Sequence, residues 1–209
     1  MMGKGAKRME KGNRTFAEMM KPARQWLEGR DPMEIARKSG IEYDAGAACF
    51  RLKSLGYDII IFWPELNVQP EMDAWYPLVI LHYMKLADGT PVEGKLIQFS
   101  ALWDGMVRGG GFDWQSEKAL EQIFGACSED EIRRACQKLG AREMRSNADL
   151  CYEFPFLPNY PITLKIWLPD DEFPLSAHLF LDASADHYLT VEDAVTAGSL
   201  LLEELRSRQ

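Results

Sequence analysis

The residues best suited to chemistry lie near the C-terminus, between a predicted strand and a predicted helix. Residues 172–204 contain two of the three histidines of the chain together with a group of carboxylates. Imidazole, carboxylate and hydroxyl side chains bind polar ligands and transfer protons, so a binding site is expected in this segment. The candidate ligand-binding residues are His178, Asp182, Ser184, Asp186, His187 and Tyr188.

Three of these side chains also offer the ligands of a metal site. The oxygens of Asp182 and Asp186 suit magnesium, calcium or manganese, whereas the imidazole of His187 favours a transition metal. Glu192 would then serve as the general base. This pattern predicts a metal-dependent hydrolase or lyase that uses residues 182–193.

A structural hypothesis explains the same segment without a ligand. Thr190 and Asp193 have the spacing of a helix cap, and acids near the start of a helix are stabilised by its dipole. Asp182 or Ser184 can satisfy backbone amides in a tight turn. Capping accounts well for these residues, and the sequence leaves capping and ligand binding as alternatives.

Strand periodicity separates two of the candidates. Alternation along residues 175–181 places His178 and Asp182 on the same face, together with Ser176 and Phe180. His178 and Asp182 are four residues apart, which is about 13 Å in a regular strand. A site that uses both side chains therefore needs a ligand between them or a bend in the strand.

Two other features have more ordinary interpretations. His82 lies in a helix predicted over 73–86 with no carboxylate close to it in the sequence, so we expect a hydrogen-bonded core histidine. Residues 108–111, RGGG, lack the lysine and Ser/Thr of a phosphate-binding loop, and we expect a flexible loop there. No serine or cysteine has a recognisable base partner, so nucleophilic catalysis has little support.

Composition predicts one cytoplasmic domain. A chain of 209 residues with 46% hydrophobic residues can bury a sizeable core. Residues 1–14 are expected to be a flexible basic tail, and residues 15–209 a single domain. The net charge of −8 argues against nucleic-acid binding. No apolar run is long enough to cross a membrane, and no secretory signal is visible. The four cysteines contain no C-x-x-C pair, so we expect reduced thiols.

The order of predicted elements indicates an α+β fold. Extended segments are expected on both sides of Gly56, with helices over 115–124 and 128–139. Strands are expected within 150–168 and over 175–181, and a final helix over 190–206. Because strands and helices do not alternate regularly, we predict a mostly antiparallel sheet packed with several helices.

Three stretches of the chain resemble a known family. They are DPMEIARKSGIEY at 31–43, LVILHYMKLADGTPVEGKLIQFSALWDG at 78–105 and EFPLSAHLFLDASADHYLTVEDAV at 172–195. The chain resembles the domain of unknown function 3786 family of anaerobic bacteria and archaea over most of residues 30–205. Some relatives join this domain to an iron-sulfur segment of corrinoid-linked one-carbon metabolism, which implies a cofactor-handling context. This chain lacks such a cysteine cluster.

Three functional hypotheses follow. The leading one is a binding or accessory protein of anaerobic metabolism that presents a pocket near His178, Asp182, Asp186 and His187 to a small molecule, a cofactor or a partner protein. The second is the metal-dependent hydrolase or lyase. The third is an interaction module, which predicts a large exposed apolar patch. The sequence identifies no particular cofactor.

Overall fold

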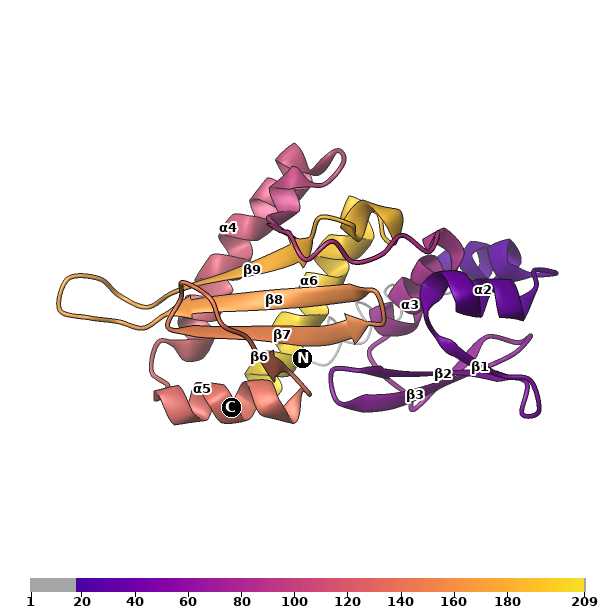
Figure 1. Ribbon diagram of the computed structural model, residues 1–209, viewed down its shortest axis with the longest axis horizontal. Helices are drawn as coiled ribbons and strands as arrows, with labels where there is room; N and C mark the ends of the chain where they lie inside the picture. The colour runs from indigo at the N-terminus through magenta and orange to yellow at the C-terminus, as the bar shows by residue number, and fades with distance from the viewer. Residues whose placement is uncertain (1–17, 209) are drawn as a thin grey trace, which may run out of the picture.

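In the computed structural model, which describes residues 18–208, the strands form two antiparallel sheets (Figure 1). The helices lie against them in separate groups, so the predicted α+β class is confirmed. The strands divide between a small and a large sheet, whereas the sequence pattern suggested one. The predicted tail at 1–14 lies outside the described residues.

The small sheet is a meander in which each strand pairs with the next along the chain. Its strands are β1 (Glu42–Asp44), β2 (Cys49–Ser54), β3 (Tyr57–Phe62) and β4 (Asn67–Gln69). The turn between β2 and β3 contains Gly56 with a φ of +82°, a conformation that favours glycine. The two extended segments predicted around Gly56 are therefore confirmed.

The large sheet has the strand order β5-β9-β8-β7-β6. Its strands are β5 (Leu96–Ile97), β6 (Arg142–Glu143), β7 (Leu150–Leu157), β8 (Tyr160–Trp167) and β9 (Ser176–Asp182). Along β8 and β9 every second residue is a buried apolar one, and these residues are Ile162, Leu164, Ile166, Ala177, Leu179 and Leu181. This alternation means that one face of the large sheet carries the core.

Helices cover that apolar face. Figure 1 shows α4 (Gly105–Phe124) and α6 (Val191–Ser207) behind the large sheet, and α5 (Glu129–Lys138) beside its β6 edge. The helices α4 and α6 pack closely, because a Cβ atom at Gly198 would lie 2.5 Å from the ring of Phe112. Residues 18–27 form a further helix.

The helix α3 (Trp75–Leu86) connects the two halves of the molecule. It packs against α6 on one side and against α2 (Pro32–Ser39) on the other. The Ser54 hydroxyl, at the end of β2, donates to the Phe156 carbonyl of β7 and lies 2.6 Å from the Tyr76 hydroxyl of α3. Buried residues from both sheets accordingly belong to one hydrophobic cluster.

The loop prediction for residues 108–111 is wrong, because these residues lie inside α4. The short 3-10 helix η1 (Phe99–Ala101) packs against α4 so closely that a Cβ atom at Gly109 would overlap the Phe99 carbonyl oxygen. The Asp113 carboxylate then accepts the backbone N–H groups of Phe99 and Ser100, both at 3.0 Å. Gly109, one of the three glycines that suggested a loop, allows this helix contact instead.

Residues 18–208 include no helix whose length and hydropathy would let it cross a membrane.

Candidate functional site

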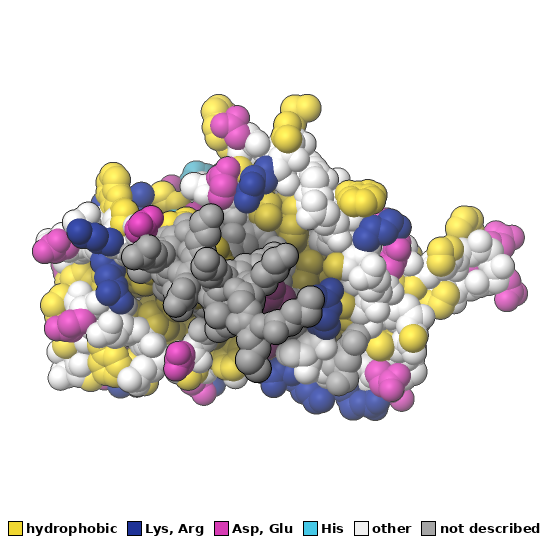
Figure 2. Space-filling view, turned by 180° about the vertical axis from the view of Figure 1, so that it is seen from behind, with side chains coloured by type: hydrophobic (Ala, Val, Ile, Leu, Met, Phe, Trp, Pro, Cys, Tyr) yellow, Lys and Arg dark blue, Asp and Glu magenta, His cyan; other side chains and the backbone are white. Residues whose placement is uncertain are grey.

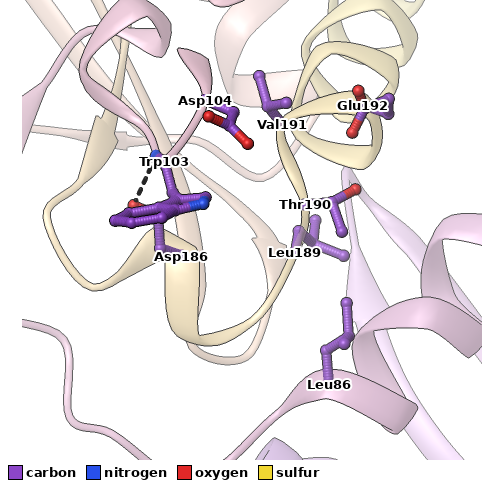
Figure 3. A pocket seen from close by; sticks show the side chains of 8 residues that line it. All are labelled: Leu86, Trp103, Asp104, Asp186, Leu189, Thr190, Val191 and Glu192. Carbon is purple, nitrogen blue, oxygen red and sulfur yellow. Dashed lines mark hydrogen bonds between the residues drawn. The ribbon is translucent and has the colours of Figure 1, made fainter.

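A cleft of about 480 Å³ lies where four segments of the chain meet (Figure 3). These are the end of α3, the turn before α4, the 3-10 helix η2 (Ala185–His187) and the start of α6. The residues around the cleft are Leu86, Trp103, Asp104, Asp186, Leu189, Thr190, Val191 and Glu192. Its size is that of a typical small-molecule site.

Asp186 connects two of the four segments. Both of its carboxylate oxygens lie 3.1 Å from the backbone nitrogen of Trp103, which donates to them. Figure 3 shows this hydrogen bond and the indole of Trp103 beside Asp186. A carboxylate has about four acceptor positions, so Asp186 keeps acceptor capacity for a ligand after it binds this amide.

The cleft combines acidic and apolar side chains. Asp104, Asp186 and Glu192 supply three carboxylates, and none of the eight residues around the cleft is Lys, Arg or His. Leu86, Leu189 and Val191 form the apolar part. Asp104 and Glu192 stand at the N-terminal ends of α4 and α6, where the helix dipoles stabilise negative charge.

A hydrogen-bonded chain of three side chains supports the cleft from α3 and α6. The Thr190 hydroxyl caps α6 by accepting the Asp193 backbone N–H at 3.3 Å, and it donates to Asp193 Oδ2 at 2.9 Å. Asp193 Oδ1 lies 2.7 Å from His82 Nδ1. The predicted cap is therefore confirmed. The hydrogen bond predicted for His82 is present, and its partner comes from 111 residues further along the chain.

Tyr160 places an unused hydroxyl group close to these acids. Among residues 18–208 its fully buried hydroxyl has no hydrogen-bond partner. Burial raises the pKa of Tyr160 well above its ordinary value, and the nearby carboxylates of Asp186 and Asp193 raise this pKa further. The Tyr160 hydroxyl is therefore a buried donor that makes no hydrogen bond within the described residues.

Asp182 and Ser184, both predicted ligand residues, bind each other, and Asp182 also binds two backbone amides. The Asp182 carboxylate accepts the N–H groups of Glu93 and Gly94 at 2.9 and 2.7 Å, and the Ser184 hydroxyl at 2.7 Å. Burial raises the pKa of Asp182, but the hydrogen bonds from Ser184, Glu93 and Gly94 outweigh it and hold this pKa below its ordinary value. These two residues anchor the segment that leads into β5.

His187 and Tyr188 hold a neighbouring loop. His187 Nδ1 lies 2.7 Å from Asp88 Oδ2 and 3.1 Å from the Thr90 hydroxyl. The hydrogen bond with His187 is the main reason that the pKa of Asp88 falls to about 2. The Tyr188 hydroxyl donates to the Thr90 carbonyl, and its ring stacks on Tyr83 at 5.4 Å.

His178 lies on the face of the large sheet opposite the core. Its Nε2 is 3.1 Å from the Ser176 hydroxyl, and its ring contacts those of Trp167 and Phe180. His178 and Asp182 lie four residues apart on β9 and bind different partners.

The structure brings only part of the predicted site together. Asp186 and Glu192 both border the cleft. Asp182, Asp186 and His187 bind different partners, and in the part of the chain that the structure describes no three His, Cys, Asp or Glu side chains are arranged to hold a metal ion. Sequence reasoning missed Leu86, Trp103 and Asp104, because nothing in the sequence indicates that residues 86, 103 and 190 meet.

Comparison with known proteins identifies a family. The family model described as Domain of unknown function (DUF3786) matches residues 31–204. The search of curated proteins and the search of solved structures gave no match. The match includes all of the residues around the cleft. The chain therefore belongs to the domain of unknown function 3786 family.

Proposed function

We propose that this protein binds a small organic cation in the cleft between α3, α4 and α6 and acts as a binding or accessory protein. The observation that carries the proposal is the combination of Asp104, Asp186 and Glu192 around a cleft with no basic side chain among its residues. Such a surface attracts an ammonium group and repels anions.

The remaining residues of the cleft fit the rest of such a ligand. Leu86, Leu189 and Val191 offer apolar contact to a hydrocarbon portion. The indole of Trp103 can contact the cation through its ring face, an interaction of about 0.5–1 kcal/mol at an exposed site. An amine with a short apolar body is therefore the favoured ligand class.

Titration calorimetry with a matched panel of ligands tests this proposal. Primary alkylamines and choline should bind, whereas carboxylates of the same size should not. Asp186→Asn keeps an acceptor oxygen for the Trp103 amide, and Glu192→Gln keeps the length of the side chain. Each change should weaken amine binding about tenfold, because one charge-assisted hydrogen bond contributes about 1.5 kcal/mol.

Glu203→Gln is the matched control, because Glu203 is an exposed acid of α6 away from the cleft. This variant should bind amines like the wild type. Binding should also weaken as salt is added, since exposed charges are screened. Equal amine affinity in the wild type and in an Asp186→Asn/Glu192→Gln double variant would contradict the proposal.

The His82–Asp193 hydrogen bond favours a second candidate, an acid–base enzyme such as a lyase or hydrolase. A carboxylate at Nδ1 fixes the imidazole tautomer and leaves Nε2 for proton transfer. Leu86, one helical turn after His82, and Thr190, which donates to Asp193, both border the cleft. This second candidate predicts that the wild type converts a bound amine to a product. His82→Asn should abolish this turnover without loss of amine binding.

We also propose a cytoplasmic location. The support is that the four cysteines form no disulfide among the described residues, as is usual for proteins of a reducing compartment. Fractionation of the native cells, with the protein followed by an antibody, tests this assignment.

A further inference from the structure

Two glycines in the middle of α4 have no explanation within one molecule. Gly109 is required, because a Cβ atom there would overlap the Phe99 carbonyl. At Gly110 a Cβ atom would meet only Ser100 at an ordinary 3.7 Å, and at Gly111 it would meet nothing within 4 Å. Glycine is a poor helix former, so its presence at 110 and 111 suggests close approach of something outside the molecule.

Large apolar side chains lie on both sides of these glycines on the exposed face of the helix. Trp103 is 80% exposed, Val107 87% and Trp114 63%, and Met106 beside them is 86% exposed. A helical repeat of 3.6 residues places Val107, Gly111 and Trp114 along one stripe of α4, whereas Trp103 lies in the turn before the helix. Figure 1 shows this end of α4 projecting beyond β9, and Figure 2 shows hydrophobic side chains protruding at the same upper edge of the molecule.

We propose that this stripe of α4, Val107, Gly111 and Trp114 with Met106 beside it, is a dimer interface that binds the same stripe of a second copy. The two helices run antiparallel and cross between Gly110 and Gly111. Val107 and Trp114 are equally far from this point, so Val107 of each copy packs against Trp114 of the other.

The second copy is favoured over another partner for two reasons. A twofold interface requires one surface to complement itself, and this stripe does so because Val107 of each copy meets Trp114 of the other. The area is also sufficient. Trp114 can bury about 150–250 Å², so with Met106 and Val107 the contact would bury about 1,000 Å² over both copies, the lower limit for a specific interface.

Sedimentation equilibrium of the wild type and two single variants tests the proposal. We expect the wild type to dimerise with a dissociation constant on the order of 10 μM, because the contact is small. Val107→Glu and Trp114→Lys should each weaken dimerisation more than tenfold, since each buries a charge against an apolar side chain. Both residues are mostly exposed, so circular dichroism should show unchanged folding.

Mixing the two variants tests the antiparallel arrangement itself. A heterodimer of Val107→Glu with Trp114→Lys would contain one ion pair between the introduced carboxylate and the introduced ammonium group, and one native Val107–Trp114 contact. Equimolar variants should therefore associate again, as native mass spectrometry can detect. A parallel pair could not do this, because position 107 would face 107. Failure of the mixture to form heterodimers would overturn the proposal.

Met33→Glu is the matched control, because Met33 is an exposed apolar residue of α2. It should dimerise like the wild type. Two other results would also overturn the proposal. One is a wild-type protein that remains monomeric at about 100 μM, which is ten times the expected dissociation constant. The other is a dimer that survives Val107→Glu and Trp114→Lys. Val107, Gly111 and Trp114 do not border the cleft, so these results are independent of ligand binding.

Discussion

Asp182 shows how one buried carboxylate organises the chain around the site. Only 4% of its surface is exposed, and it receives hydrogen bonds from two amides of the loop before β5 and from Ser184. These bonds favour the ionised form, so the pKa of Asp182 lies below its ordinary value of 3.8. The carboxylate therefore stabilises the folded protein above that pH.

Asp182→Asn should lower the free energy of unfolding at pH 7 by about 1.5–3 kcal/mol, the usual contribution of hydrogen bonds to a charged group. The loss should shrink as the pH falls below 3.8, because the wild-type carboxylate then becomes protonated as well. Urea unfolding across this pH range measures both effects. Asp58→Asn, which changes an exposed ion pair with Lys53, should have little effect. A pH-independent difference for Asp182→Asn would contradict this explanation.

The buried tyrosines provide a second test at the residue scale. Tyr83 donates to the Ser39 carbonyl at 2.6 Å and accepts the Asn159 amide at 3.0 Å, whereas the Tyr160 hydroxyl has no partner among the described residues. Tyr83→Phe should cost about 1–3 kcal/mol of stability, and Tyr160→Phe should cost less than about 0.5 kcal/mol. Urea unfolding compares the two. A large loss for Tyr160→Phe would reveal a water or ligand bound to its hydroxyl.

At the scale of elements, α4 depends on its contact with η1. Gly109→Ala introduces a methyl group that overlaps the Phe99 carbonyl, which should destabilise the protein by about 1–3 kcal/mol. Gly111→Ala adds a methyl group in open space and should stabilise it by about 0.5–1 kcal/mol through helix propensity. Urea unfolding of dilute, monomeric protein measures both. Similar effects of the two substitutions would mean that η1 does not press on α4.

At the scale of the whole molecule, the two sheets share one core. Ser54 hydrogen-bonds to Tyr76 and donates to Phe156, and so joins the small sheet to α3 and the large sheet. Buried side chains from both sheets form one continuous cluster. A shared core of this kind favours cooperative unfolding, as the predicted single domain over 15–209 requires.

Calorimetry should therefore show one unfolding transition with equal calorimetric and van't Hoff enthalpies. Ser54→Ala should lower the midpoint of this transition but should not divide the transition into two. The change removes the hydrogen-bond partner of the buried Phe156 carbonyl and of the buried Tyr76 hydroxyl, at a cost of about 1–3 kcal/mol. Ser146→Ala, in an exposed loop, is the control. Two separate transitions in the wild type would contradict the single domain.

The sequence by itself determined the features that depend on neighbouring residues. Alternation predicted β9, and a capping pattern predicted the start of α6, where Thr190 with Asp193 forms the expected hydrogen bonds. Periodicity and capping act over a few residues, so they can be recognised without knowing how the chain folds. The α+β class followed from the order of these elements.

Only the tertiary structure decided which distant groups became partners. His82 met Asp193, and Asp182 met the amides of Glu93 and Gly94, across 88 to 111 residues of sequence. The helix at 105–111 formed against local propensity, because Gly109 lets η1 pack there and Asp113 binds its amides. Such contacts depend on how sheets and helices pack, so the cleft and the role of each acid could not be read from residue spacing alone.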